Sequence, residues 1–221
     1  MEVFDGLHAF MWDSMIANNC NTYLIDGSVR VLIDPGHEAH FDHVVKGLDA
    51  VGLQVSDIDL VICTHCHPDH LEGAGRFKNE RAQVTLHEAE WQFLTGMAGR
   101  RWGAMVAPPD GIIPAFFMRE GPLNLEGLEL EVFHTPGHSP GSVCLYWPDK
   151  KVLFSGDLIF AEGLGRVDLP GGEGNLLKES IRCMKELDTR WIMPGHGEYV
   201  FGENDVRQTF WNLETVWFQY I

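Results

Sequence analysis

The chain has 221 residues, of which 45% are hydrophobic and 22% charged. This is the composition of an ordinary globular protein, and it excludes disordered, collagen-like and disulfide-stapled classes. Sixteen Lys and Arg against 32 Asp and Glu give a formal net charge of −16. Because this charge repels nucleic-acid phosphates and anionic lipids, we expect neither a nucleic-acid partner nor a membrane partner.

The N-terminus and the cysteines indicate where the protein works. The start, Met-Glu-Val-Phe-Asp, lacks the basic and apolar regions of a signal peptide, and no apolar run approaches the length of a membrane span. The five cysteines are odd in number, which is typical of free thiols in a reducing compartment rather than of a disulfide framework. We therefore expect a cytoplasmic protein.

Short runs rich in β-branched and aromatic residues, bounded by turn residues, predict strands along the chain. The expected strands cover residues 21–26, 29–34, 59–64, 83–87, 128–134, 142–147 and 151–155. Between the second and third of these, apolar residues recur every three or four positions, which predicts a helix over 41–51. Further helices are expected at 88–97 and 175–187.

The C-terminal stretch predicts an amphipathic helix over about 203–220 that closes the fold. Its expected apolar face consists of Val206, Phe210, Leu213, Trp217 and Tyr220. Trp211 and Phe218 lie off this face. They are candidates for a contact between subunits in a homo-oligomer, or else singly exposed aromatic side chains.

No repeat or linker-like run divides the sequence, so we expect a single domain over residues 1–221. Its least periodic part, at about 95–127, predicts an irregular insertion. Such an insertion in a compact domain is either functional or a surface loop packed on its own apolar side chains.

The densest group of metal-binding residue types lies in the segment 64–70, THCHPDH, directly after an apolar run. Imidazole nitrogens and carboxylate oxygens are the donors that borderline divalent metals accept. In an extended segment, side chains two apart point the same way, so His65 and His67 are expected to bind one ion while Cys66 points away. Asp69 and His70 follow the turn at the proline and are expected to face a second ion.

Three later residues complete the set: His138 in TPGHSPGS, Asp157 in FSGD and His196 in IMPGHG. Each follows an apolar run and lies beside Gly or Pro, which permit the tight turns of strand-end loops. Because active sites are commonly assembled from several loops on a rigid scaffold, we expect these loops to contribute to one site.

The order and type of these residues resemble the metallo-β-lactamase superfamily, and within it glyoxalase II (hydroxyacylglutathione hydrolase) and its short bacterial members. The blocks TPGHSPGS at 135–142 and GRVDLPGG at 165–172 belong to the same likeness, as does Asp34 in LIDPG. The likeness covers roughly residues 17–200. The seven matching metal-site positions are His65, His67, Asp69, His70, His138, Asp157 and His196.

The resemblance implies an α/β fold, the four-layer αβ/βα sandwich of two mixed β-sheets, with the metal site at one end of the sheets. It implies two divalent metal ions as cofactors, zinc first, with iron or manganese as alternatives. One ion would take His65, His67 and His138, and the other Asp69, His70 and His196. Asp157 would bridge the two ions.

The activity implied by the resemblance is metal-dependent hydrolysis of a small-molecule thioester or related activated acyl substrate. A metal-bridging hydroxide would attack the acyl carbon. Asp69 and Asp157 would be the catalytic carboxylates. The candidates for substrate contacts are Arg166, Tyr23, Arg100 and Arg101. Full-length glyoxalase II continues into a helical region that contributes to its glutathione site, whereas here only residues 197–221 follow the last histidine.

Other readings of the same motifs stay open at this point. A persulfide dioxygenase resembles the chain in these motifs and uses a single iron, held by the counterparts of His65, His138 and Asp157. A lactonase is a further hydrolytic alternative. A non-catalytic metal-binding module is disfavoured, because such a module has no chemical reason to keep all seven ligands.

Overall fold

The computed structural model describes residues 1–14, 16–97, 108–109 and 111–221. The chain divides into two compact units. Unit 1 comprises residues 1–118 and 125–128, and unit 2 comprises residues 119–124 and 129–221. The single domain expected from the sequence stays a prediction.

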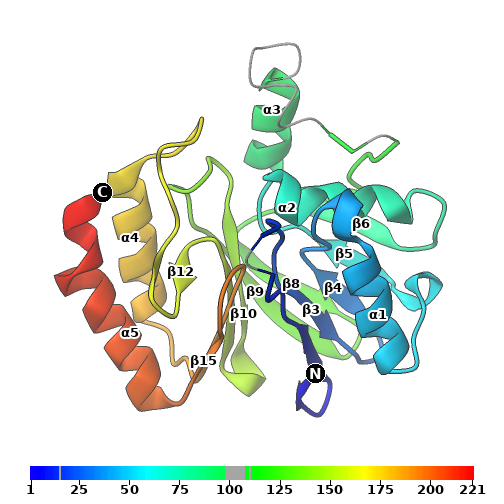
Figure 1. The fold of residues 1–221 in the computed structure, drawn as a ribbon, viewed down its shortest axis with the longest axis horizontal. Helices are drawn as coiled ribbons and strands as arrows, with labels where there is room; N and C mark the ends of the chain where they lie inside the picture. Colours follow the sequence, from blue (N-terminus) through cyan, green and yellow to red (C-terminus); the bar gives the residue numbers. More distant parts are fainter. Residues whose placement is uncertain (15, 98–107, 110) are drawn as a thin grey trace. The chain divides into compact units, whose positions relative to one another are not determined.

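Unit 1 is built on a mixed sheet whose strands lie side by side in chain order, from β1 to β7; β3 to β6 are labelled in Figure 1. Neighbours from β1 to β4 are antiparallel, whereas β4, β5, β6 and β7 are parallel. The strands are β1 (Glu2–Phe4), β2 (Leu7–Phe10), β3 (Thr22–Ile25), β4 (Val31–Ile33), β5 (Leu60–Ile62), β6 (Gln83–His87) and β7 (Phe116–Met118). The helices are η1 (Glu38–His40), α1 (Asp42–Ala50), η2 (Val55–Asp57), α2 (Pro68–Leu71), η3 (Glu72–Phe77) and α3 (Glu88–Met97).

The core of unit 1 forms where α1 covers one face of the sheet. Val44 and Leu48 of α1 are fully buried and share a hydrophobic cluster with sheet residues such as Leu24, Leu32 and Val61. This is the amphipathic pattern that predicted a helix at 41–51. The strands expected at 21–26, 29–34, 59–64 and 83–87 and the helix expected at 88–97 are also present, with differences of no more than a few residues at their ends.

Unit 2 contains a second mixed sheet, with strand order β15-β14-β11-β10-β9-β8. Of its pairs, β11 and β14 are parallel, while β10 is antiparallel to β9 and β11. The strands are β8 (Gly121–Leu125), β9 (Leu128–His134), β10 (Val143–Trp147), β11 (Val152–Gly156), β14 (Trp191–Pro194) and β15 (Val200–Phe201), with a separate ribbon of β12 (Ile159–Phe160) and β13 (Gly163–Leu164). The helices are η4 (Pro148–Lys150), α4 (Gly174–Lys185), α5 (Glu203–Thr215) and η5 (Trp217–Tyr220).

Helices α4 and α5 lie side by side in unit 2 (Figure 1), and their apolar faces share a cluster with the sheet. Ile181 of α4 and Phe210 of α5 meet Leu153 of β11 and Ile192 of β14 in this cluster. The expected strands at 128–134, 142–147 and 151–155 and the expected helix at 175–187 are confirmed.

The C-terminal helix differs from the sequence expectation beyond its first three turns. The α-helix ends at Thr215 and a 3-10 helix follows. Because a 3-10 helix has three residues per turn rather than 3.6, the buried face shifts by one position. Phe218 is therefore 8% exposed, whereas Trp217 is 36% and Tyr220 71% exposed. The assignment of Trp217 and Tyr220 to the apolar face is wrong, and Phe218 is a core residue rather than a subunit contact.

The stretch expected to be irregular, at about 95–127, contains two strands. Phe116–Met118 extends the first sheet beside β6, and Gly121–Leu125 forms the end of the second sheet beside β9. Strands this short at a sheet edge show too few residues for a clear period. Residues 98–107 and 110 lie outside the described residues, and Arg100 and Arg101 are among them. Among the helices that are described, none is long and apolar enough to span a bilayer.

Candidate metal centre

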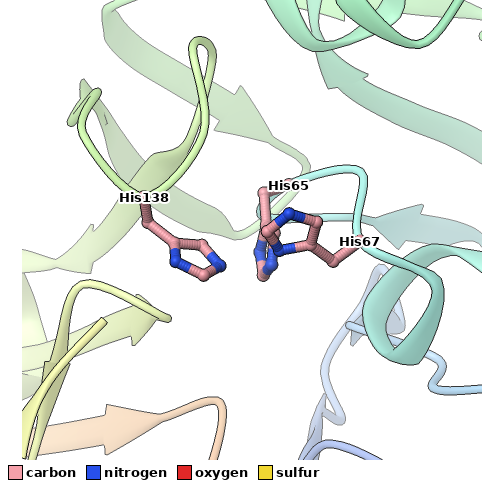
Figure 2. A group of neighbouring side chains, drawn as sticks. All are labelled: His65, His67 and His138. Carbon is pink, nitrogen blue, oxygen red and sulfur yellow. The ribbon is translucent and has the colours of Figure 1, made fainter. Parts of the chain in front are cut away.

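The loop that leaves β5 carries the first two histidines of unit 1. His67 is the N-cap of α2 and has extended backbone angles, and Pro68 occupies the first helical position, where its missing N–H is not needed. The rings of His65 and His67 lie 4.8 Å apart between centroids, at an angle of 89° (Figure 2). Their ligand atoms lie within 4.8 Å of each other, and both residues are buried. Cys66 packs into the core on the other side, as the alternation predicts.

Asp69 and His70 lie one and two residues into α2, and both are buried. Their ligand atoms also lie within 4.8 Å of each other. The His70 ring is 4.0 Å from the ring of His65 between centroids. Unit 1 thus gathers four side chains of metal-binding type within one short segment, and the ligand atoms of His65 and His70 also lie within 4.8 Å of each other.

Asp34, directly after β4, holds this segment in place through hydrogen bonds to its carboxylate. Its carboxylate accepts hydrogen bonds from Thr64 N at 2.7 Å and Thr64 Oγ1 at 2.8 Å. It also lies 2.9 Å from His70 Nδ1, which leaves Nε2 of His70 as the ligand atom. Asp34 is 2% exposed and has a left-handed φ of 55°. The sequence showed this residue only as part of a family turn, whereas the structure shows that it contacts the ring of His70, a predicted ligand.

Two further contacts to this segment had no signal in the sequence. Glu90 of α3 is fully buried and accepts a hydrogen bond from Cys66 N at 2.8 Å. Burial and the Glu90 carboxylate raise the pKa of the Cys66 thiol well above its usual value. Asn18, in the loop between β2 and β3, donates from Nδ2 to Asp69 Oδ2 at 2.8 Å. Neither residue has a motif spacing to the ligands, so only the folded chain reveals them.

In unit 2, a single carboxylate oxygen lies near two imidazole nitrogens. Asp157 Oδ2 is 3.5 Å from His138 Nε2 and 3.3 Å from His196 Nε2. Charge-assisted hydrogen bonds are shorter, at about 2.7 to 2.9 Å. Two ligands held at zinc-like bond lengths and a tetrahedral angle would be roughly 3.4 Å apart. These distances fit a carboxylate that shares an ion with each histidine better than a direct ion pair.

Backbone contacts hold the ligands of unit 2 in place. His138 Nδ1 lies 2.8 Å from the carbonyl oxygen of Arg166, so this ring presents Nε2 as its ligand atom. The absence of a side chain at Gly165 lets the chain pass close to both residues, because a Cβ there would lie 1.8 Å from the carbonyl oxygen of Asp157 and 3.2 Å from His138 Nδ1. Asp157 directly follows Gly156, the last residue of β11, whose φ is 47°. The strand β14 pairs with β11 in parallel, and His196 lies just after the end of β14. Parallel strands that end at the same edge thus bring Asp157 and His196 together.

The donor sets suit divalent cations. All seven predicted ligands are imidazoles or carboxylates. In His70 and His138, Nδ1 contacts another group of the protein, so Nε2 is the nitrogen that faces an ion. Among the buried residues in the described part of the chain, the carboxylates are Asp34, Asp69 and Glu90, and none is a Lys or Arg. A buried negative charge is costly unless a positive charge compensates it, and bound cations would supply that positive charge.

The proposed substrate contacts are placed differently from the ligands. Arg166 is exposed, and its guanidinium binds Asp168 through two hydrogen bonds of 2.7 Å. These bonds lower the pKa of Asp168 to about 2. Tyr23 lies on β3 and is 2% exposed. Arg100 and Arg101 belong to the undescribed stretch, so their role stays a prediction.

Comparison with known proteins identifies the family. The model of the metallo-beta-lactamase superfamily matches residues 15–196, most of the chain. The chain belongs to the metallo-beta-lactamase superfamily. The superfamily assignment and the two mixed sheets confirm the expected α/β sandwich fold.

The chain is also similar to named relatives and to solved structures within this superfamily. A "probable metallo-hydrolase" of Methanocaldococcus jannaschii is 35% identical over 187 residues, 80% of this chain and 87% of that protein. The hydroxyacylglutathione hydrolase GloC of Haemophilus influenzae is 31% identical, over 82% of this chain and 86% of its own. The crystal structure of TTHA1623 in a di-iron-bound form matches with a TM-score of 0.68 at 34% identity, covering 82% of this chain and 89% of that one. This metallo-beta-lactamase superfamily member is therefore a metallo-hydrolase by family, with His and Asp groups of metal-binding type.

Proposed function

We propose that this protein is a dinuclear metallohydrolase that cleaves a thioester or a related activated acyl compound. In this proposal, the four ligands of unit 1 and the three of unit 2 serve one site. One ion is held by His65, His67 and His138, the other by Asp69, His70 and His196, and Asp157 is shared. Family membership and the order of the seven residues support this assignment.

The observation that carries the proposal is the position of the Asp157 carboxylate. Its Oδ2 lies at similar distances, 3.5 and 3.3 Å, from one nitrogen of His138 and one of His196. The proposal assigns these two histidines to different ions. If the two histidines bind different ions, a carboxylate oxygen near both is placed to be their shared ligand in a two-ion site.

When bound, two divalent ions would acidify a water molecule and polarise a carbonyl oxygen. The protein's own part is to hold the ligand atoms rigidly. Asp34 orients His70, and the Arg166 carbonyl orients His138. In this proposal, Asp69 and Asp157 are the carboxylates that would orient the attacking water. The overall reaction adds water across the acyl carbon to sulfur bond and yields a carboxylate and a thiol, so no serine or cysteine nucleophile is needed.

The substrate class rests on the relatives. GloC is named as a hydroxyacylglutathione hydrolase, and its similarity spans most of both chains. TTHA1623 is named in a di-iron-bound form, so we propose zinc or iron as the metal, with manganese as the third option. Arg166 is proposed to contact an anionic part of the substrate once its pairing with Asp168 opens.

A thioester panel tests this proposal. The metal-loaded protein is assayed for thiol release from several thioesters, including S-lactoylglutathione, and for opening of a lactone and a β-lactam as comparison substrates. We expect thioesters to be hydrolysed with the highest kcat/KM and Asp157→Asn to abolish turnover. Oxygen consumption with glutathione persulfide, in the absence of thioester hydrolysis, would contradict the proposal and indicate a persulfide dioxygenase.

Two further expectations are proposed together with this function. Cys20, Cys63, Cys66, Cys144 and Cys183 all carry free thiols, which supports a reducing compartment such as the cytoplasm. Trp211 is 57% exposed and supports self-association, since large aromatic side chains are enriched at protein interfaces. Sedimentation of the purified protein would measure its oligomeric state directly.

A further inference from the structure

We propose that Asn18 is a positioning residue for Asp69, which it holds so that one carboxylate oxygen stays directed at a metal ion. The inference rests on the proposed function, because it takes Asp69 as a metal ligand. It concerns a residue of the loop between β2 and β3, about fifty residues before the ligand motif and outside every motif in the sequence.

The contact is a direct hydrogen bond with unambiguous roles. Asn18 Nδ2 lies 2.8 Å from Asp69 Oδ2. An ionised carboxylate can only accept, so the amide nitrogen must be the donor. The bond fixes the position of Oδ2 and with it the plane of the carboxylate. The torsion that sets a carboxylate plane is broad and nearly two-fold by itself, so a partner on one oxygen is what selects the orientation.

The loop around Asn18 is fixed at its base. The Trp12 backbone N–H donates to Asn21 Oδ1 at 2.9 Å, and the Trp12 indole N–H donates to the Ala17 carbonyl at 2.8 Å. The next residue, Asn19, is 2% exposed and accepts from His37 N through Oδ1 at 2.7 Å. Because both neighbours of Asn18 are held, its amide is directed before any metal or substrate binds.

The side chain of Asn18 is otherwise placed at the surface. Asn18 is an exposed residue, unlike Asp34 and Glu90, which lie inside the protein. An exposed side chain contributes little to the free energy of unfolding, so its removal separates an effect on the ligand from an effect on the fold. Outer contacts to metal ligands typically change metal affinity 10- to 100-fold, roughly.

The test compares Asn18→Leu, which keeps the shape and removes the donor, with Asn18→Gln, which keeps an amide on a longer side chain. Asn79→Leu is the matched control, because Asn79 is also exposed, lies in unit 1 and is outside the segment 64–70 that holds the predicted ligands. Each protein is titrated with zinc against a chelator, and the unfolding temperature is measured for the metal-free forms. Steady-state kinetics on the best thioester follow.

We expect Asn18→Leu to weaken one of two bound ions by about tenfold or more while the other ion keeps its affinity. The unfolding temperature of the metal-free protein and KM should stay unchanged, kcat should fall, and Asn18→Gln should recover part of the lost affinity. Asn79→Leu should match the wild type in every measurement.

Three results would overturn the inference. The first is wild-type affinity of Asn18→Leu for both ions. The second is a rise in KM alone, which would make Asn18 a substrate contact. The third is a lower unfolding temperature of the metal-free form, which would make the role of Asn18 structural. Failure of the proposed function is distinguishable, because the wild-type protein itself would then bind fewer than two ions.

Discussion

The two units hold their metal-binding side chains by different means. In unit 1, four of these side chains come from one short segment, and other side chains brace it: Asp34, Glu90 and Asn18. In unit 2, the three come from three separate loops, and backbone groups brace them, chiefly the Arg166 carbonyl and the close approach of Gly165. Side-chain bracing can be removed by a conservative substitution, whereas backbone bracing can be disturbed only by changing the path of the chain.

The largest effect is expected where unit 2 contributes the shared ligand. Asp157→Ala removes the oxygen that lies near both His138 and His196, so both ions should be lost rather than one. Loss of about 4 kcal/mol of transition-state stabilisation corresponds to a fall in kcat/KM of about a thousandfold. Metal content per chain measures this outcome, and retention of one ion at full occupancy would argue against a shared carboxylate.

The next effect tests backbone bracing directly. Gly165→Ala places a Cβ 1.8 Å from the Asp157 carbonyl oxygen, so the chain must move. Overpacking of this kind costs about 1 to 3 kcal/mol, and each kcal/mol lowers the unfolding temperature by about 2 to 4 °C in a protein of this size. Calorimetry of the metal-free protein should show this loss. Gly96→Ala is the control, since a Cβ at Gly96 meets nothing within 4 Å, and it should be neutral or stabilising.

A smaller effect is expected from the side-chain brace in unit 1. Asp34→Asn preserves the left-handed backbone, because Asn tolerates φ near 55° as well as Asp does. It removes the negative charge that faces His70 Nδ1. We expect metal affinity to fall about 10- to 100-fold with the fold retained. Chelator competition gives the affinity, and a value equal to that of the wild type would mean that Asp34 serves only the turn.

The smallest effect concerns the exposed pair of Arg166 and Asp168. Arg166→Gln keeps the backbone carbonyl that contacts His138, so metal content should not change. In the wild type, the Arg166 guanidinium holds the pKa of Asp168 at about 2, below the ordinary 3.8. The small stabilisation from this pair is therefore present above pH 4 and is lost as the pH falls through about 2.

The free energy of unfolding of the wild type and of Arg166→Gln, measured between pH 5 and pH 2, checks this direction. The free energy of Arg166→Gln should fall less steeply over this range, because the variant lacks the pair with Asp168. A higher KM with unchanged metal content would support Arg166 as the proposed substrate contact. Loss of metal in Arg166→Gln would instead show that the side chain, not the backbone, holds His138.

The sequence predicted well those features that repeat along the chain or cluster within it. The strands before the predicted ligands and the helix α1 follow from periodicity, and the gathering of His65, His67, Asp69 and His70 follows from their closeness in the sequence. The shift at Phe218 was missed because helical periodicity does not show where an α-helix tightens into a 3-10 helix.

The outer contacts could not be read from the sequence for a different reason. Asn18 and Glu90 reach the ligand segment from 51 and 24 positions away, and no local pattern records such long-range contacts. The carbonyl of Arg166 is invisible to any argument from side-chain type, because every residue has a carbonyl. Predicting these contacts requires the path of the chain, which only the folded structure supplies.

The central claim is that the chain holds two divalent ions through a shared carboxylate. Elemental analysis of the protein, purified without added metal or chelator, tests this claim most directly. We predict close to two equivalents per chain, as zinc or as a mixture of zinc and iron. One equivalent of iron alone, unchanged after incubation with excess zinc and iron, would contradict the two-ion account.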